Sequence, residues 1–265
     1  MKARAADKVT HGDPVRLGDM TWQEVRDYLV TRDALIVPIG TCEQHGAHLP
    51  LSTDTRIAEA FADRIADETG VAVAPTLAYG VNLPCDRFVP GTAGFTLDGL
   101  REALEGLLAD WTRQGLRRFF VVTAHGCAVD GFGFAHHEAI KDAALPLLTE
   151  GACEVLVLFP YWTDVGDLLS KQDKVEHACE VETSLALHLF PELVRTDRIE
   201  DGPPEGEETR FEAFPEGVAT GPPAAGWSGA EGAPSAATAE KGRAIFERCL
   251  EPMVRAVRTQ IGPAG

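Results

Sequence analysis

Short apolar runs separated by amphipathic segments constrain the fold of this chain most strongly. Four runs, at 34–39, 71–77, 118–123 and 153–159, have the length and the side chains of buried strands. Apolar residues at steps of three and four predict helices between or after them. Strands that alternate with helices predict an α/β fold, with a central, mostly parallel sheet covered by helices on both faces.

The helices have recognisable ends. Thr21 followed by Glu24 is a capping-box pattern, and Gly70 is a typical helix stop. The predicted helices lie at 22–30, 56–69, 100–111, 177–190 and 245–257.

The chain length of 265 residues suits one large α/β domain. We expect an irregular N-terminal arm over residues 1–19 and a single domain over residues 20–265. Residues 198–235 are rich in Gly, Pro, Ala and Glu without any period. A loop of that length is functional, an oligomer contact, or disordered.

The formal net charge of −17 argues against nucleic acid or an anionic membrane as a partner. No apolar stretch approaches the roughly 20 residues needed to span a bilayer, and the N-terminus has no signal-peptide core. Six cysteines without a Cys-x-x-Cys pair suit reduced thiols. We therefore expect a cytoplasmic protein with a small-molecule substrate.

Acidic and imidazole side chains crowd the segment that follows the first predicted strand, 34–39. Glu43, His45, His48 and Asp54 fall within twelve residues. Such groups at the end of a buried strand would repel one another or be poorly solvated. A divalent cation removes that difficulty, because it binds oxygen and nitrogen ligands together. His48 is either a support for a ligand or a contact to the substrate.

His125 directly follows another predicted strand, 118–123. Sites in parallel sheets form outside the carboxyl ends of the strands. The topology therefore brings His125 to the edge where Glu43 and His45 lie. The neighbouring run His136-His137-Glu138 is a weaker metal candidate, because adjacent residues of a helix do not share a face.

The predicted helix 177–190 contains two acidic residues with different surroundings. Its apolar stripe consists of Ala178, Val181, Leu185, Ala186 and Leu189. Glu182 falls inside this stripe and Glu180 outside it. A bare carboxylate on a buried stripe would cost several kcal/mol or take up a proton, and a metal makes it acceptable. We therefore expect Glu182, not Glu180, to be a metal ligand.

His177 lies five residues before Glu182, which is ~140° around a regular helix. Both can face one site only if His177 sits at the helix entrance. His177 is therefore better interpreted as a proton-transfer group than as a ligand beside Glu182. Trp162, which follows a predicted strand, either forms a wall of the site or packs at an edge of the core.

The segment 40–54 reads Gly-Thr-Cys-Glu-Gln-His-Gly-Ala-His-Leu-Pro-Leu-Ser-Thr-Asp. It resembles the creatininase (creatinine amidohydrolase) family pattern Gly-Ser-x-Glu-Gln-His-Gly-x-His-Leu-Pro-x-x-Thr-Asp. Further segments at 90–92, 123–126, 177–184 and 232–242 resemble the family's other motifs, in the same order. The resemblance covers about residues 20–258.

This resemblance implies a creatininase-like fold and a dinuclear metal hydrolase that commonly assembles as a hexamer. The ions in such proteins are zinc, manganese or iron. Carried over residue by residue, it implies that Asp54 bridges two ions and that His177 transfers protons. The implied ligands are Glu43, His45, Asp54, His125 and Glu182.

The chain departs from the family pattern beside His125. Cys127 stands where the family has Gly or Glu, and Ala128 stands where it has Asn. Cys127 is either a soft ligand or a small core residue. The loop at 80–88 lacks a His that many relatives carry, so we expect altered substrate contacts, with Asp86, His48 and Trp162 as the candidates.

We therefore expect a metal-dependent amidohydrolase that cleaves a non-peptide C–N bond of a small molecule by a metal-activated water, in a homo-oligomer. His177 or Glu180 would protonate the leaving nitrogen. The alternative is a biosynthetic enzyme that uses the same metals for a non-hydrolytic step, such as dehydration, cyclisation or amide formation. A non-catalytic metal-binding or scaffold protein is a third reading.

Overall fold

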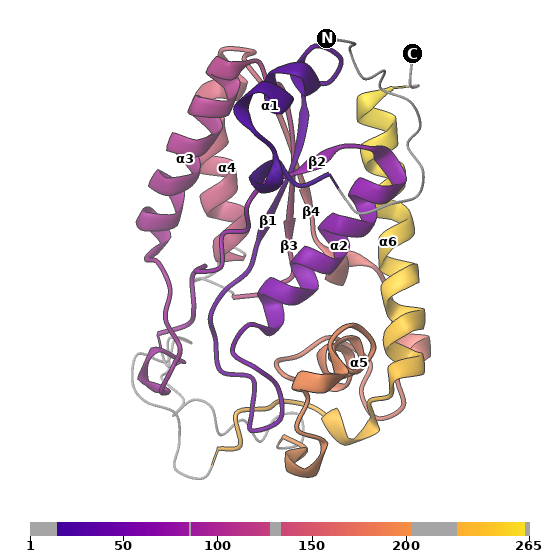
Figure 1. Ribbon diagram of the computed structural model, residues 1–265. Helices are drawn as coiled ribbons and strands as arrows, with labels where there is room; N and C mark the ends of the chain where they lie inside the picture. Colours follow the sequence, from indigo (N-terminus) through magenta and orange to yellow (C-terminus); the bar gives the residue numbers. More distant parts are fainter. Residues whose placement is uncertain (1–14, 85, 128–133, 203–226, 263–265) are drawn as a thin grey trace.

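A computed structural model of the chain describes residues 15–84, 86–127, 134–202 and 227–262. Its centre is one sheet of four parallel strands in the order β2-β1-β3-β4 (Figure 1). The strands are β1 (Ala34–Ile39), β2 (Ala72–Val73), β3 (Arg118–Thr123) and β4 (Glu154–Leu158). The predicted single α/β domain with a parallel sheet is confirmed.

Helices cover both faces of the sheet, as predicted (Figure 1). The α-helices are α1 (Trp22–Leu29), α2 (Thr53–Thr69), α3 (Leu97–Gln114), α4 (Ala135–Thr149), α5 (Glu180–Leu189) and α6 (Ala239–Ile261). Side chains of β1 alternate between the faces. Leu35, Val37 and Ile39 pack with α3 and α4, whereas Ile36 packs with α2, α5 and α6.

Local capping explains where several helices begin and end. Thr21 and Glu24 form the predicted capping box of α1. Thr96 accepts a hydrogen bond from the backbone of Gly99 at the start of α3. Gly70 ends α2 in the left-handed region at φ 67°, where glycine avoids the strain that a side chain would cause.

Two elements differ from the predictions. β2 spans two residues instead of the predicted 71–77, although the N–H groups of Ala74 and Leu77 still donate to the carbonyls of Ile36 and Pro38 in β1. The helix α4 was not predicted; its alanine-rich segment contains Pro146 and has no marked apolar stripe.

The start of α5 also differs from the predicted 177–190. Ala178 has φ 52°, and α5 begins at Glu180. This left-handed turn places His177 before the helix, at the entrance that its proposed role requires.

The structure describes only part of the N-terminal arm and of the long loop near the C-terminus. The predicted arm of residues 1–19 is described from residue 15 onward, where Leu17–Asp19 forms a 3₁₀ turn and Arg16 pairs with Asp63. Residues 1–14, and 203–226 of the predicted 198–235 loop, lie outside the described residues. Within the described part, no helix is both long and apolar enough to cross a membrane.

Candidate active site

Three segments meet at the carboxyl edge of the sheet. They are the loop after β1, the turn after β3, and the first turn of α5. Gly40 lets the first loop pass close to α2, because a Cβ there would meet the backbone of Thr55 at 2.3 Å. Asp54, in the first turn of α2, is thereby held beside the loop that carries Glu43 and His45.

Asp54 is the centre of a compact group of buried side chains. One carboxylate oxygen lies 3.4 Å from His45 Nε2 and the other 3.3 Å from His125 Nδ1. His125 Nδ1 also lies 3.2 Å from Glu43 Oε2, and His45 Nε2 lies 3.8 Å from Glu182 Oε2. All five residues have exposed fractions of 5% or less.

The ligand atoms form overlapping sets that share Asp54. One set joins Asp54 with Glu43 and His125, and another joins it with His45 and Glu182. Within each set the atoms lie within 4.8 Å of one another, which a single cation can bridge. Glu43 and His45 also form a set with His177.

The imidazoles are oriented as metal ligands. His45 Nδ1 lies 3.1 Å from the carbonyl of Glu43, and His125 Nε2 lies 2.8 Å from the carbonyl of Val81. In the neutral rings these nitrogens therefore donate, and the opposite nitrogens turn their lone pairs toward the carboxylates. Backbone carbonyls fix the tautomer of metal-binding histidines in the same way.

Two polar atoms of the group have no hydrogen-bond partner in the described part of the chain. They are His45 Nε2 and Asp54 Oδ2, both buried. The contacts that they do make are ion pairs at 3.3–3.8 Å. Buried polar atoms of this kind ordinarily have a partner, and three carboxylates with two imidazoles are a donor set that suits zinc or manganese. The residues therefore fit a divalent metal.

Burial and the charges of neighbouring side chains shift the pKa values of these five residues. Burial opposes the charge on His45, but Asp54, Glu182 and Glu43 raise its pKa to about 10. Burial likewise opposes the charge on His125, but Glu43 and Asp54 raise its pKa well above 6.5. The carboxylates thus hold protons on the imidazoles, and a bound cation would displace those protons.

The pKa values of the three carboxylates are shifted in different directions. Burial raises the pKa of Glu182 to about 7, despite the opposing effect of His45. Burial also acts to raise the pKa values of Glu43 and Asp54, but their histidine neighbours outweigh it and lower both.

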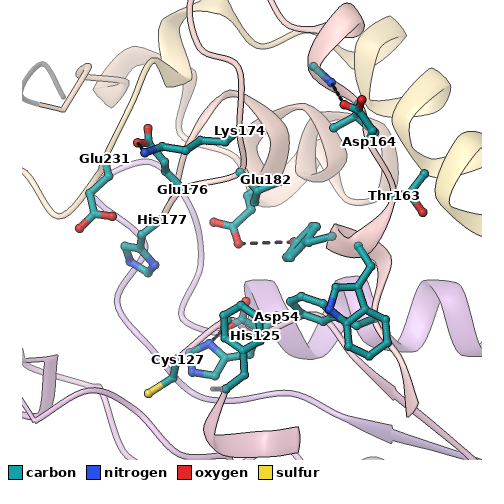
Figure 2. A pocket seen from close by; sticks show the side chains of 18 of the residues that line it. Asp54, His125, Cys127, Thr163, Asp164, Lys174, Glu176, His177, Glu182 and Glu231 are labelled. Atoms are coloured by element: carbon teal, nitrogen blue, oxygen red, sulfur yellow. Dashed lines mark hydrogen bonds and ion pairs between the residues drawn. The ribbon is translucent and has the colours of Figure 1, made fainter. Parts of the chain in front are cut away.

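A cavity of about 640 Å³ opens over this group. Its aromatic wall consists of Phe134, Phe159, Tyr161 and Trp162, and its other charged lining residues are Asp164, Asp173, Lys174, Glu176 and Glu231. Figure 2 shows Glu182, His177 and His125 around the cavity, with Glu176 and Glu231 on the His177 side. The described lining is therefore mainly acidic around an aromatic wall.

The predicted proton-transfer and wall residues lie at this cavity. His177 lines it, with Nδ1 4.0 Å from Glu43 Oε2 and its ring centroid 4.5 Å from that of His45. Trp162 lines it with 62% of its surface exposed. Cys127 also lines it, whereas its neighbour Ala128 lies outside the described residues.

Two expected substrate contacts lie deeper in the protein. His48 is buried, its Nε2 lies 2.9 Å from Thr183 Oγ1, and burial lowers its pKa to about 4. Asp86 is fully buried and accepts a hydrogen bond from Gln44. Neither is among the described residues that line the cavity. They support the first loop instead of facing a substrate.

Glu180 differs most from its expected place. It lies outside the predicted apolar stripe, yet its exposed fraction is 0%. Its carboxylate pairs with Lys241 and accepts hydrogen bonds from the backbone N–H groups of Ser170 and Lys171. These contacts join α5 to α6 and to the preceding loop. Glu180 is absent from the described cavity lining, so the expectation that it faces the substrate is corrected.

Several site residues were not anticipated. Tyr161 donates a hydrogen bond to Glu182 Oε1 at 3.4 Å, and Gln44 contacts His177. Gln44 lies between two predicted ligands and Tyr161 lies beside Trp162, so adjacency was the available signal. His136 is buried, and its ring bonds to Thr123 and the backbone of Val81.

Comparison with known proteins agrees with the family resemblance of the sequence. The family model of creatinine amidohydrolase matches residues 18–257. A creatinine amidohydrolase of Pseudomonas putida is 29% identical over 94% of this chain and 98% of its own. A mycofactocin precursor peptide peptidase of Mycobacterium ulcerans is 33% identical over 89% of both chains. Relatives thus include a peptidase, and the expected restriction to non-peptide bonds is not confirmed.

Solved structures share the fold. A manganese creatininase superposes with a TM-score of 0.78 at 28% identity, covering 94% of this chain and all of the other. A mutant creatininase of Zn-Zn type superposes with a TM-score of 0.77 at 27% identity, covering 95% and 100%. These matches support a hydrolase of C–N bonds. The chain belongs to the creatinine amidohydrolase family.

Proposed function

We propose that this protein is a metal-dependent hydrolase that cleaves an amide-type C–N bond with an activated water molecule. The observation that carries the proposal is the shared position of Asp54. Its two oxygens face two separate ligand sets, one with Glu43 and His125 and the other with His45 and Glu182. Asp54 would therefore be shared between the two cation sites, and two neighbouring cations suit the hydrolysis of an amide.

The five residues would hold two divalent ions, zinc, manganese or iron. Bound there, the ions supply Lewis acidity and lower the pKa of water, so that a nucleophile is present at neutral pH. The remote nitrogens of His45 and His125 are fixed by backbone carbonyls. Because these contacts hold the rings, the ligand atoms are preorganised before any ion arrives.

His177 is the proton-transfer group in this proposal. It lines the cavity beside Glu43 and lies outside the two sets that share Asp54. Its imidazole can take a proton as the water attacks and return it to the leaving nitrogen. General acid–base help of this kind contributes roughly 10²–10⁴ in rate. Glu180, bound to Lys241, has no part in this step.

The cavity favours a substrate larger than a single small ring. Its volume of about 640 Å³ lies within the roughly 300–1,000 Å³ of cavities that hold drug-sized ligands. Trp162 and Phe159 offer flat surfaces for an apolar or aromatic group. An extended amide or a short peptide fits these features, which agrees with a peptidase among the relatives.

Metal analysis and a substrate panel test the function. The purified protein should contain about two divalent ions per chain, lose activity on chelation and regain it with zinc or manganese. The panel consists of creatinine, formamides and short peptides, each followed by mass spectrometry. Absence of bound metal, or turnover that chelation leaves intact, contradicts the proposal. Products that lack the elements of water would instead favour the non-hydrolytic alternative.

Asp54→Asn is the sharpest variant for this purpose. It keeps the shape of the bridging residue but halves its ligand capacity, so both metal content and activity should fall. Glu251→Gln, on the exposed side of α6, is the matched control. Assembly into a homo-oligomer stays a prediction, which light scattering of the purified protein tests.

A further inference from the structure

Asp86 is a fully buried carboxylate that the proposed reaction does not use. It lies in the 3₁₀ turn Asp86–Phe88, and its exposed fraction is 0%. Its Oδ1 lies 3.3 Å from Nε2 of Gln44, whose own exposed fraction is 5%. Gln44 stands between Glu43 and His45 in the chain, so the contact connects Asp86 to the metal-ligand loop.

Two neighbours fix the orientation of the Gln44 amide. The carboxylate of Asp86 accepts hydrogen bonds when ionised, so the amide NH₂ must face it. The backbone N–H of Gly46 donates to Gln44 Oε1 at 3.0 Å, so the amide oxygen must face the opposite way. Both constraints select the same orientation. The amide NH₂ is thereby presented to His177 Nε2 at 2.7 Å.

Gln44 holds His177 through two groups at once. Its backbone carbonyl also lies 2.7 Å from His177 Nε2. This nitrogen can therefore accept from the side-chain amide or donate to the carbonyl, and in either case it remains tied to Gln44. The opposite nitrogen, Nδ1, is left on the side of Glu43, 4.0 Å from Oε2, where the residue lines the cavity.

We propose that Asp86, acting through the amide of Gln44, is a positioning residue that holds His177 with Nδ1 directed at the substrate cavity. Asp86 orients the amide, and the side chain and backbone carbonyl of Gln44 together hold Nε2 in place. With Nε2–H donating to the carbonyl, Nδ1 faces the cavity as the acceptor that takes the proton of the water and passes it to the leaving nitrogen. This inference rests on the proposed function, because it assigns a purpose to the orientation of its proton-transfer residue.

Asp86→Asn is the primary test, because asparagine keeps the shape but removes the charged acceptor, which leaves the Gly46 N–H as the one described constraint on the Gln44 amide. Asn82→Ala is the matched control. Asn82 is a buried residue of the same loop, and its side-chain hydrogen bonds within the described part of the chain go to Thr41 and to the carbonyl of Cys42. Both variants loosen the loop, but Asp86→Asn alone disturbs the connection to His177.

We expect Asp86→Asn to lower kcat by about 10- to 100-fold, with KM and metal content within about twofold of wild type; groups that orient a metal site typically have effects of this size. Asn82→Ala should leave kcat within about threefold. In a His177→Ala background, Asp86→Asn should cause no further loss, because the residue it positions is already gone. A full additional loss in that background overturns the inference.

A spectroscopic readout separates this inference from the proposed function. The imidazole ¹⁵N signals of His177, assigned by their loss in His177→Ala, should shift in Asp86→Asn and stay unchanged in Asn82→Ala. Unchanged His177 signals in Asp86→Asn overturn the inference whether or not any amide is cleaved. Should Asp86→Asn fail to fold, Asp86→Ser also removes the carboxylate from Gln44 and is judged by the same shift. Failure of the metal and substrate tests overturns the function without altering this result.

Discussion

Two buried carboxylates in the first turn of α5 have opposite surroundings. Glu180 is matched by the ammonium of Lys241 and by two backbone N–H groups. Glu182 faces His45, the hydroxyl of Tyr161 and the backbone N–H of Ala178. They stand two residues apart and are both nearly inaccessible to solvent. Only Glu182 lines the cavity.

The difference shows that burial of an acid does not identify a functional group, whereas its partners do. Glu180 is paired with the ammonium group of Lys241, and this ion pair holds α5 against α6. Burial raises the pKa of Glu182 to about 7, despite the opposing effect of His45. A group left with such a shifted pKa in a cavity is a candidate for metal binding or catalysis.

Glu182→Gln should have the largest effect. It removes one ligand of the set that contains His45 and Asp54, and metal stabilisation of a transition state contributes several kcal/mol. We expect activity to fall by about a thousandfold or more, with metal content reduced and the fold retained. Steady-state kinetics and metal analysis measure this. Near-wild-type turnover would remove Glu182 from the proposed centre.

Lys241→Met should affect stability instead of chemistry. It leaves Glu180 buried without its ion-pair partner, which costs about 3 kcal/mol in the free energy of unfolding. Turnover per folded molecule should stay within about twofold. The double variant Glu180→Gln/Lys241→Met should recover much of the loss, because no buried charge is left unpaired. Urea unfolding measures both variants against wild type. A large fall in kcat with unchanged stability would reverse the comparison.

The stability of the metal-free protein should fall as the pH rises above about 6.5. The folded-state pKa of Glu182 is raised from 4.5 to about 7, so its stabilising proton is present below pH 4.5 and lost through pH 7. The raised pKa of His45 extends the fall from pH 6.5 to about 10. Below pH 6.5 the lowered pKa values of His48 and His136 oppose the effect of Glu182, and at still lower pH those of Glu43 and Asp54 act in the same direction.

Urea unfolding in the presence of a chelator, repeated from pH 5 to 9, tests this dependence. Relative to wild type, Glu182→Gln should lose the contribution that falls between pH 4.5 and 7, because glutamine does not titrate. A wild-type profile that is flat, or that rises, between pH 7 and 9 is incompatible with the described surroundings of His45.

Tyr161→Phe should give the smallest effect. The hydroxyl donates to Glu182 Oε1 at 3.4 Å, and burial raises the pKa of Tyr161 well above 10, so it stays protonated at neutral pH. Loss of a long hydrogen bond of this type costs about 1 kcal/mol, or roughly fivefold in rate. Kinetics at saturating metal measure the change. An effect as large as that of Glu182→Gln would indicate direct contact with the substrate.

Hydrophobic patterning predicts most of this fold. The runs at 34–39 and 118–123 are β1 and β3 as the structure has them, because strands buried on both faces are continuously apolar. The extent of β2 and the presence of α4 were harder to predict from the sequence. β2 is regular over two residues only and continues as separate hydrogen bonds to β1, and the mixed, alanine-rich surface of α4 hides its period.

Some residues of the site could likewise be predicted from the sequence, and others could not. Glu182 could be selected because it interrupts an apolar stripe, and His125 because it ends a strand at the edge shared with the first loop. The place of Glu180 could not be found, because it depends on Lys241, 61 residues away in the chain. The contact of Asp86 with Gln44 spans 42 residues and leaves no periodic signal.

The left-handed turn at Ala178 has a consequence for sequence variation. Ala178 is the one non-glycine residue with positive φ among the described residues, and it has no exposed surface. A β-branched side chain is strongly disfavoured in that conformation, whereas glycine adopts it without strain. The position beside His177 should therefore accept glycine and reject valine or isoleucine in working homologues. The left-handed backbone at this one residue therefore restricts which amino acids the position can carry.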